Sequence, residues 1–107
     1  PILLYNVPGR TGSNLLPSTV LRLAHEVPGI VGIKEASGNT EQGMQILAGA
    51  PEGFAVISGD DGLAIPQTAV GYSGLISVLG NAEPKLMRGL IHQTLNGQAA
   101  QATRAYA

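Results

Sequence analysis

The chain has 107 residues and a formal net charge of −1, and 12% of its residues are charged, against roughly 25% in an average soluble domain. The length suits one domain or part of one, and the low charge predicts that much of the chain is buried against itself or another segment. Cysteine is absent, which excludes disulfides, zinc–thiolate sites and cysteine nucleophiles. The scattered basic residues indicate neither nucleic-acid nor membrane binding, no metal site is expected, and we expect a cytoplasmic protein.

The first half of the chain alternates apolar runs with helical patterns. PILLYNV at 1–7 is typical of a short buried strand, and PGRTGSN at 8–14 is expected to form a loop. Residues 15–27 place apolar side chains on one face of a helix and end before Pro28-Gly29. A strand over 30–37 and a helix over 41–50 repeat this order.

The second half continues the same alternation. We expect a strand over 53–61, a weak helix over 63–71 interrupted by Pro66, a strand over 73–81 and a long helix from 83, divided near Asn96-Gly97. The strands read as continuous apolar runs, as in a parallel sheet covered on both faces. Four βα units predict an α/β fold that forms half of a TIM (β/α)8 barrel, with a doubly wound open sheet as the alternative.

Lysine occurs only twice in the chain, and Lys34 ends an apolar strand, whereas Lys85 lies in the last helix. In a βα barrel, chemistry takes place where strands end. With Ile30, Val31 and Ile33 as apolar neighbours, we expect Lys34 to be partly desolvated, which favours the neutral amine that forms Schiff bases with carbonyls. Tyr5 ends the preceding strand and could transfer protons. From position alone, the preferred interpretation is that Lys34 is a solvated or paired charge at the sheet rim and that Tyr5 is a core residue.

Four stretches in series, LYNVPGRTG, GIKEASGN, SGDD and GLISVLGN, closely resemble the dihydrodipicolinate synthase family of pyruvate-dependent class I aldolases. The resemblance runs through all four predicted strands. It implies that Lys34 forms the imine with pyruvate, that Tyr5 donates and accepts protons, and that Arg10 binds the carboxylate of aspartate 4-semialdehyde. It also implies that Ile76 contacts pyruvate through its backbone and that Gly59 shapes the pocket floor. No cofactor or metal is implied, because the imine of Lys34 serves as the electron sink.

On its own, Arg10 would be a surface charge, and Gly59 could be needed only to avoid crowding in a turn. The family's second tyrosine, its Gly-Thr-Thr segment and the helices that help to build dimers or tetramers do not occur in residues 1–107, which we therefore expect to be strands 5–8 of a longer barrel. Homo-oligomerisation is implied by the resemblance, and the isolated chain is expected to be unstable or to self-associate.

The resemblance implies a lyase of lysine and diaminopimelate biosynthesis that condenses pyruvate with aspartate 4-semialdehyde. Two alternatives remain open at this point. One is a related aldolase acting on a sugar acid, of the N-acetylneuraminate lyase or 2-keto-3-deoxygluconate aldolase type. The other is a non-catalytic fragment.

Overall fold

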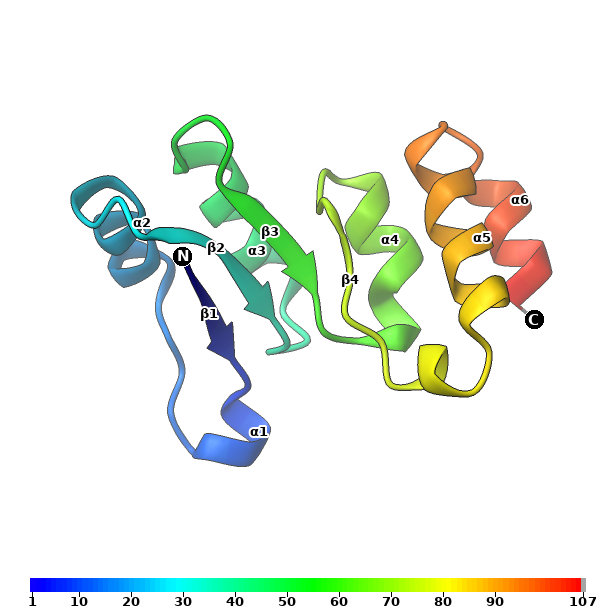
Figure 1. The fold of residues 1–107 in the computed structure, drawn as a ribbon, viewed down its shortest axis with the longest axis horizontal. Helices are drawn as coiled ribbons and strands as arrows, with labels where there is room; N and C mark the ends of the chain where they lie inside the picture. The colour runs from blue at the N-terminus through cyan, green and yellow to red at the C-terminus, as the bar shows by residue number, and fades with distance from the viewer. Residues whose placement is uncertain (107) are drawn as a thin grey trace.

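The computed structural model describes residues 1–106 and contains one parallel four-stranded sheet in the order β1-β2-β3-β4. Figure 1 shows the arrows of β1, β2 and β3 side by side and pointing the same way, and β4 pairs in parallel with β3. The strands are β1 (Ile2–Asn6), β2 (Ile30–Glu35), β3 (Ala55–Ser58) and β4 (Gly74–Leu75). The helices are α1 (Pro8–Thr11), α2 (Pro17–Glu26), α3 (Thr40–Gly49), α4 (Ala64–Ala69), α5 (Pro84–Leu95) and α6 (Ala99–Tyr106), with short 3-10 turns η1 (Asp61–Leu63) and η2 (Leu79–Asn81).

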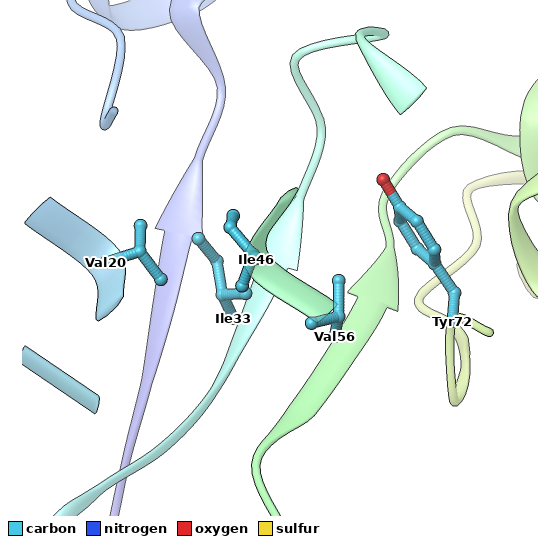
Figure 2. Packing of buried hydrophobic residues seen from close by; sticks show 5 residues of the cluster. All are labelled: Val20, Ile33, Ile46, Val56 and Tyr72. Carbon is cyan, nitrogen blue, oxygen red and sulfur yellow. The ribbon is translucent and has the colours of Figure 1, made fainter. Parts of the chain in front are cut away.

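The main core lies between the sheet and helices α2 and α3. Figure 2 shows Val20 of α2 and Ile46 of α3 packed with Ile33 and Val56 of the central strands, together with Tyr72. These five side chains are at most 1% exposed. Because side chains alternate along a strand, residues one position away from Ile33 and Val56 point to the opposite face of the sheet. That face carries no helix among residues 1–106 and leaves Leu3 and Tyr5 40% and 52% exposed.

A second apolar cluster lies beyond β4, where α5 and α6 pack side by side (Figure 1). Its buried members are Ile65 of α4, Met87 and Leu90 of α5, and Ala102 of α6. The division of the last helix near Asn96-Gly97 is confirmed, since Gly97 adopts φ +81° between α5 and α6. This left-handed conformation is one that glycine adopts without a steric penalty.

Three local predictions were wrong. The expected loop at 8–14 begins with the helical turn α1, because Pro8 can occupy the first position of a helix and the Gly12 N–H closes the turn onto the Pro8 carbonyl. Pro66 does not interrupt α4, because it lies in the first turn, where its missing N–H removes no helical hydrogen bond. The fourth strand is only two residues long instead of spanning 73–81, because the chain turns away after Leu75 into η2.

Strand β4 is short because the side chain of Asp61 binds the residues that follow it. Its carboxylate accepts hydrogen bonds from the backbone N–H groups of Val78 (3.1 Å) and Leu79 (2.9 Å) and from the Ser77 hydroxyl. These bonds hold the backbone after β4 in a turn, so its N–H groups are satisfied without a strand ladder. Burial alone would raise the pKa of Asp61, but the hydrogen bonds from Leu79, Ser77 and Val78 lower it below its ordinary value.

Candidate functional site

The predicted catalytic pair comes together on the open face of the sheet. Tyr5 and Lys34 are register partners in the parallel β1–β2 ladder. The Lys34 Nζ atom lies 4.2 Å from the centroid of the Tyr5 ring, within the range of a cation–π contact. Tyr5 is 52% exposed, so it is not the core tyrosine that position alone allowed. An amine and a phenol at this distance can share a bound carbonyl compound as nucleophile and proton carrier.

The surroundings of Lys34 differ from the sequence-based expectation. Ile33 belongs to the core on the opposite face and cannot shield the amine. The side chain instead lies beside the Tyr5 ring and above Gly59, which directly follows β3. Lys34 is half-buried by these contacts with neighbouring strands.

Gly59 is required by the lysine stem rather than by its backbone conformation. A Cβ atom at position 59 would lie 2.8 Å from Lys34 Cε and 2.6 Å from Ala36 Cβ. Both distances are well below van der Waals contact. The φ angle of Gly59 is not positive, so its backbone conformation does not require glycine. The absence of a side chain at position 59 instead leaves room for Lys34. A side chain at position 59 would therefore crowd the Lys34 stem as well as the turn.

Arg10 and Ile76 lie at the same end of the sheet but on different segments. Arg10 is in the last turn of α1 and exposed, and it forms no ion pair with any of residues 1–106. Ile76 follows β4, and its backbone N–H donates to the Ser58 carbonyl at 2.9 Å, while its side chain is 42% exposed. The structure thus brings Lys34, Tyr5 and Gly59 close together. Within residues 1–106, neither Arg10 nor Ile76 forms a hydrogen bond or an ion pair with any of these three.

Sequence reasoning missed a buried polar cluster directly behind the predicted catalytic pair. Asn6 and Glu35 each follow a member of that pair, are register partners, and are only 2% and 1% exposed. Asn6 Nδ2 donates to Glu35 Oε1 at 3.0 Å and to Oε2 at 3.2 Å. The strand period of two could have indicated that both side chains point away from the open face. It could not have indicated that they meet.

A groove of about 430 Å³ lies between the end of β4 and α5, away from Lys34. Its lining includes Leu75, Ser77, Met87 and Ile91.

Residues 1–106 contain no group of three His, Cys, Asp or Glu side chains that could hold a metal ion. Among the same residues, no helix is both long and apolar enough to cross a membrane.

The family model for the dihydrodipicolinate synthetase family matches residues 1–107. The chain belongs to this family. It is 49% identical over 107 residues to the 4-hydroxy-tetrahydrodipicolinate synthase of Salinibacter ruber, covering all of this chain and 35% of that protein. It is 47% identical over 102 residues to the synthase of Flavobacterium psychrophilum, covering 95% of this chain and 35% of the relative. The chain therefore spans about a third of the length of the curated relatives that it matches.

Solved structures of the family agree with the fold. The dihydrodipicolinate synthase of Aquifex aeolicus superposes with a TM-score of 0.94 at 37% identity, over 98% of this chain and 36% of that one. The chloride-inhibited synthase of Acinetobacter baumannii, crystallised in complex with pyruvate, superposes with a TM-score of 0.91 at 41% identity, over 98% and 36% of the two chains. The predicted fold class, a parallel (βα)4 segment of a TIM barrel, is confirmed, and the doubly wound alternative is wrong.

Proposed function

We propose that this chain carries the imine-forming part of a 4-hydroxy-tetrahydrodipicolinate synthase, which condenses pyruvate with aspartate 4-semialdehyde in lysine and diaminopimelate biosynthesis. The observation that carries the proposal is the position of Lys34, with its amine 4.2 Å from the Tyr5 ring centroid and its stem above Gly59. The family membership and the pyruvate complex of the Acinetobacter baumannii relative support pyruvate as the first substrate. A cytoplasmic location is part of the same proposal, as for a biosynthetic enzyme.

The proposed first step is attack of the neutral Lys34 amine on the keto carbon of pyruvate. Loss of the carbonyl oxygen as water gives a protonated imine, which withdraws electrons from the neighbouring methyl group. Removal of a methyl proton then gives an enamine, whose carbon attacks the aldehyde. The protonated imine itself accepts the electron pair, so the proposed step requires no further cofactor.

Tyr5 is proposed to carry protons to and from the carbinolamine and the aldehyde oxygen, because its phenol both donates and accepts hydrogen bonds. Arg10 is proposed to bind the aldehyde's carboxylate, for which the planar guanidinium offers two parallel N–H donors. The exposure of Arg10 on α1 leaves it free to meet a ligand at this end of the sheet. The backbone at Ile76 is proposed to contact pyruvate from the side of β4.

We further propose that these residues are strands 5–8 of a (βα)8 barrel that the rest of a longer polypeptide completes. Sequential parallel strands with a helix after each are the pattern of such barrels. Both outer strands, β1 and β4, have a free edge within residues 1–106. The open face with Leu3 and Tyr5 would become the barrel interior. A homo-oligomer of the complete protein is part of this proposal.

The experiment is covalent trapping with pyruvate and sodium borohydride, followed by intact mass measurement and peptide mapping of the full-length protein. The expected result is one pyruvate-derived adduct on Lys34. Lys85, the only other lysine of residues 1–107, serves as an internal control and should stay unmodified. Equal labelling of both lysines, or labelling of neither by folded protein, would refute the proposed role of Lys34. Turnover with aspartate 4-semialdehyde but not with sialic acid or 2-keto-3-deoxygluconate identifies the second substrate.

A further inference from the structure

The buried carboxylate of Glu35 lies on the opposite side of β2 from the amine of Lys34. All of its hydrogen-bond partners are donors: Asn6 Nδ2, the backbone N–H of Ser37 at 3.0 Å, and Gln42 Nε2 at 3.3 Å. An ionised carboxylate, which only accepts hydrogen bonds, matches such a set. No cation among residues 1–106 lies within 4.0 Å of it. A buried charge without a counter-ion is costly to a fold, so stability by itself does not explain a glutamate here.

The same cluster extends to the segment that carries Arg10. Asn6 Oδ1 accepts from the Leu15 N–H at 3.0 Å, and Asn6 Nδ2 donates to Asn14 Oδ1 at 3.0 Å. Asn14 Nδ2 in turn donates to Gln42 Oε1 at 3.0 Å, and Gln42 Nε2 reaches the Leu15 carbonyl at 3.1 Å. The chain between β1 and α2 is thus fastened to Glu35 at the point where it returns from α1.

Two backbone hydrogen bonds continue the connection across the strand ends. The Ala36 N–H donates to the Asn6 carbonyl at 2.8 Å, and the Gly59 N–H donates to the Glu35 carbonyl at 3.2 Å. The ends of β1, β2 and β3 therefore meet at Asn6 and Glu35. Their side chains lie behind the sheet, whereas Tyr5, Lys34 and Gly59 lie in front of it.

We infer that Glu35 is a positioning residue, whose buried carboxylate holds Lys34 against Tyr5 and, through Asn6, Asn14 and Gln42, holds the segment that presents Arg10. The inference rests on the proposed function, because it assigns Glu35 a role in that reaction without contact to substrate.

Glu35→Gln tests this inference because it keeps the size and shape of the side chain and replaces one carboxylate oxygen, an acceptor, with an NH2 group, a donor. The new NH2 group would face Gln42 Nε2, another donor. Turning the Gln42 amide to relieve this would point its oxygen at the Leu15 carbonyl and break its hydrogen bonds with Asn14. The cluster therefore has no arrangement that satisfies a neutral amide at position 35, and the strand ends should shift relative to each other.

The variant is compared with the unmodified full-length protein by the rate of pyruvate trapping per folded molecule and by kcat and KM for the aldehyde. Misplacement of reacting groups by about 1 Å is expected to slow trapping and kcat by roughly tenfold to a hundredfold. KM for the aldehyde should rise, because the segment that carries Arg10 is loosened. Glu52→Gln, which removes an exposed carboxylate, is the matched control and should leave all three values unchanged.

A merely structural role for Glu35 would lower the active fraction but leave KM and the trapping rate per folded molecule unchanged, and this outcome would overturn the inference. If Glu35→Gln does not fold, Asn14→Ala decides, because Asn14 is exposed and its loss cuts the link to the Arg10 segment. An unchanged KM for the aldehyde in that variant would also overturn the inference. Failure of the unmodified protein to be trapped would instead refute the proposed function.

Discussion

Replacing Gly59 with alanine tests whether the position of Lys34 determines imine formation. The added Cβ would lie 2.8 Å from Lys34 Cε, and relaxed carbon–carbon contacts are about 3.5–4.0 Å, so the lysine stem would have to retreat by about 1 Å. The contact with Ala36 Cβ, at 2.6 Å, prevents relief in that direction. A misplacement of this size costs up to about a hundredfold in rate.

The assay is the rate of pyruvate trapping at Lys34, followed by borohydride reduction and mass measurement, in the full-length protein. Gly29→Ala is the matched control, because a Cβ at position 29 would meet nothing within 4 Å and its φ is not positive. We expect the control to react at the normal rate and Gly59→Ala to react much more slowly, with the two variants unfolding at similar temperatures. Normal trapping by Gly59→Ala would show that the reactive amine does not occupy the place described for it.

Other changes test the packing and the ends of the fold. Gly43→Ala should destabilise the protein by about 1–3 kcal/mol, because its Cβ would overlap the Tyr72 hydroxyl. Gly89→Ala, whose Cβ would meet nothing within 4 Å, should stabilise the protein by up to about 1 kcal/mol. Thermal unfolding measures both variants, and equal effects would contradict the packing argument. The pKa of Asp61 is lowered in the folded state, so its carboxylate stabilises the fold above the ordinary pKa of 3.8, and this contribution is lost as pH falls through the lower pKa of the folded state. Asp61→Asn should therefore destabilise the protein at neutral pH and much less in acid. A difference in unfolding free energy that does not change with pH would refute this prediction. The isolated 107-residue chain should self-associate in analytical ultracentrifugation, because its sheet has two free edges and an exposed apolar face; a monodisperse monomer would contradict that expectation.

Tyr72 lies in the core on the helix-covered side of the sheet, the side on which the Glu35 carboxylate also lies. Its hydroxyl is buried and has no hydrogen-bond partner among residues 1–106, and its ring is 1% exposed. Burial, together with the negative charge of Glu35, raises the pKa of Tyr72 to about 12. Tyr72 therefore stays protonated at any physiological pH and acts as part of the core rather than as an acid or base.

The order of elements was predictable from the sequence because it depends on local patterns. Apolar runs bounded by glycine and proline mark strands, and a period of 3.6 marks helices, so both can be recognised from residues a few positions apart. The place of Lys34 at a strand end follows from the same patterns. The roles proposed for Lys34, Tyr5, Arg10, Ile76 and Gly59 came from the family resemblance and stay predictions until trapping and turnover are measured.

Only the tertiary structure decided which residues meet across the sheet. The pairing of Tyr5 with Lys34 is set by strand register, and the bond between Asn6 and Glu35 joins residues 29 positions apart. The early end of β4 depends on Asp61, whose partner Leu79 lies 18 positions away. Local periodicity contains no information about such contacts, because their energy is gained only when the strands have assembled and water is excluded from between the groups.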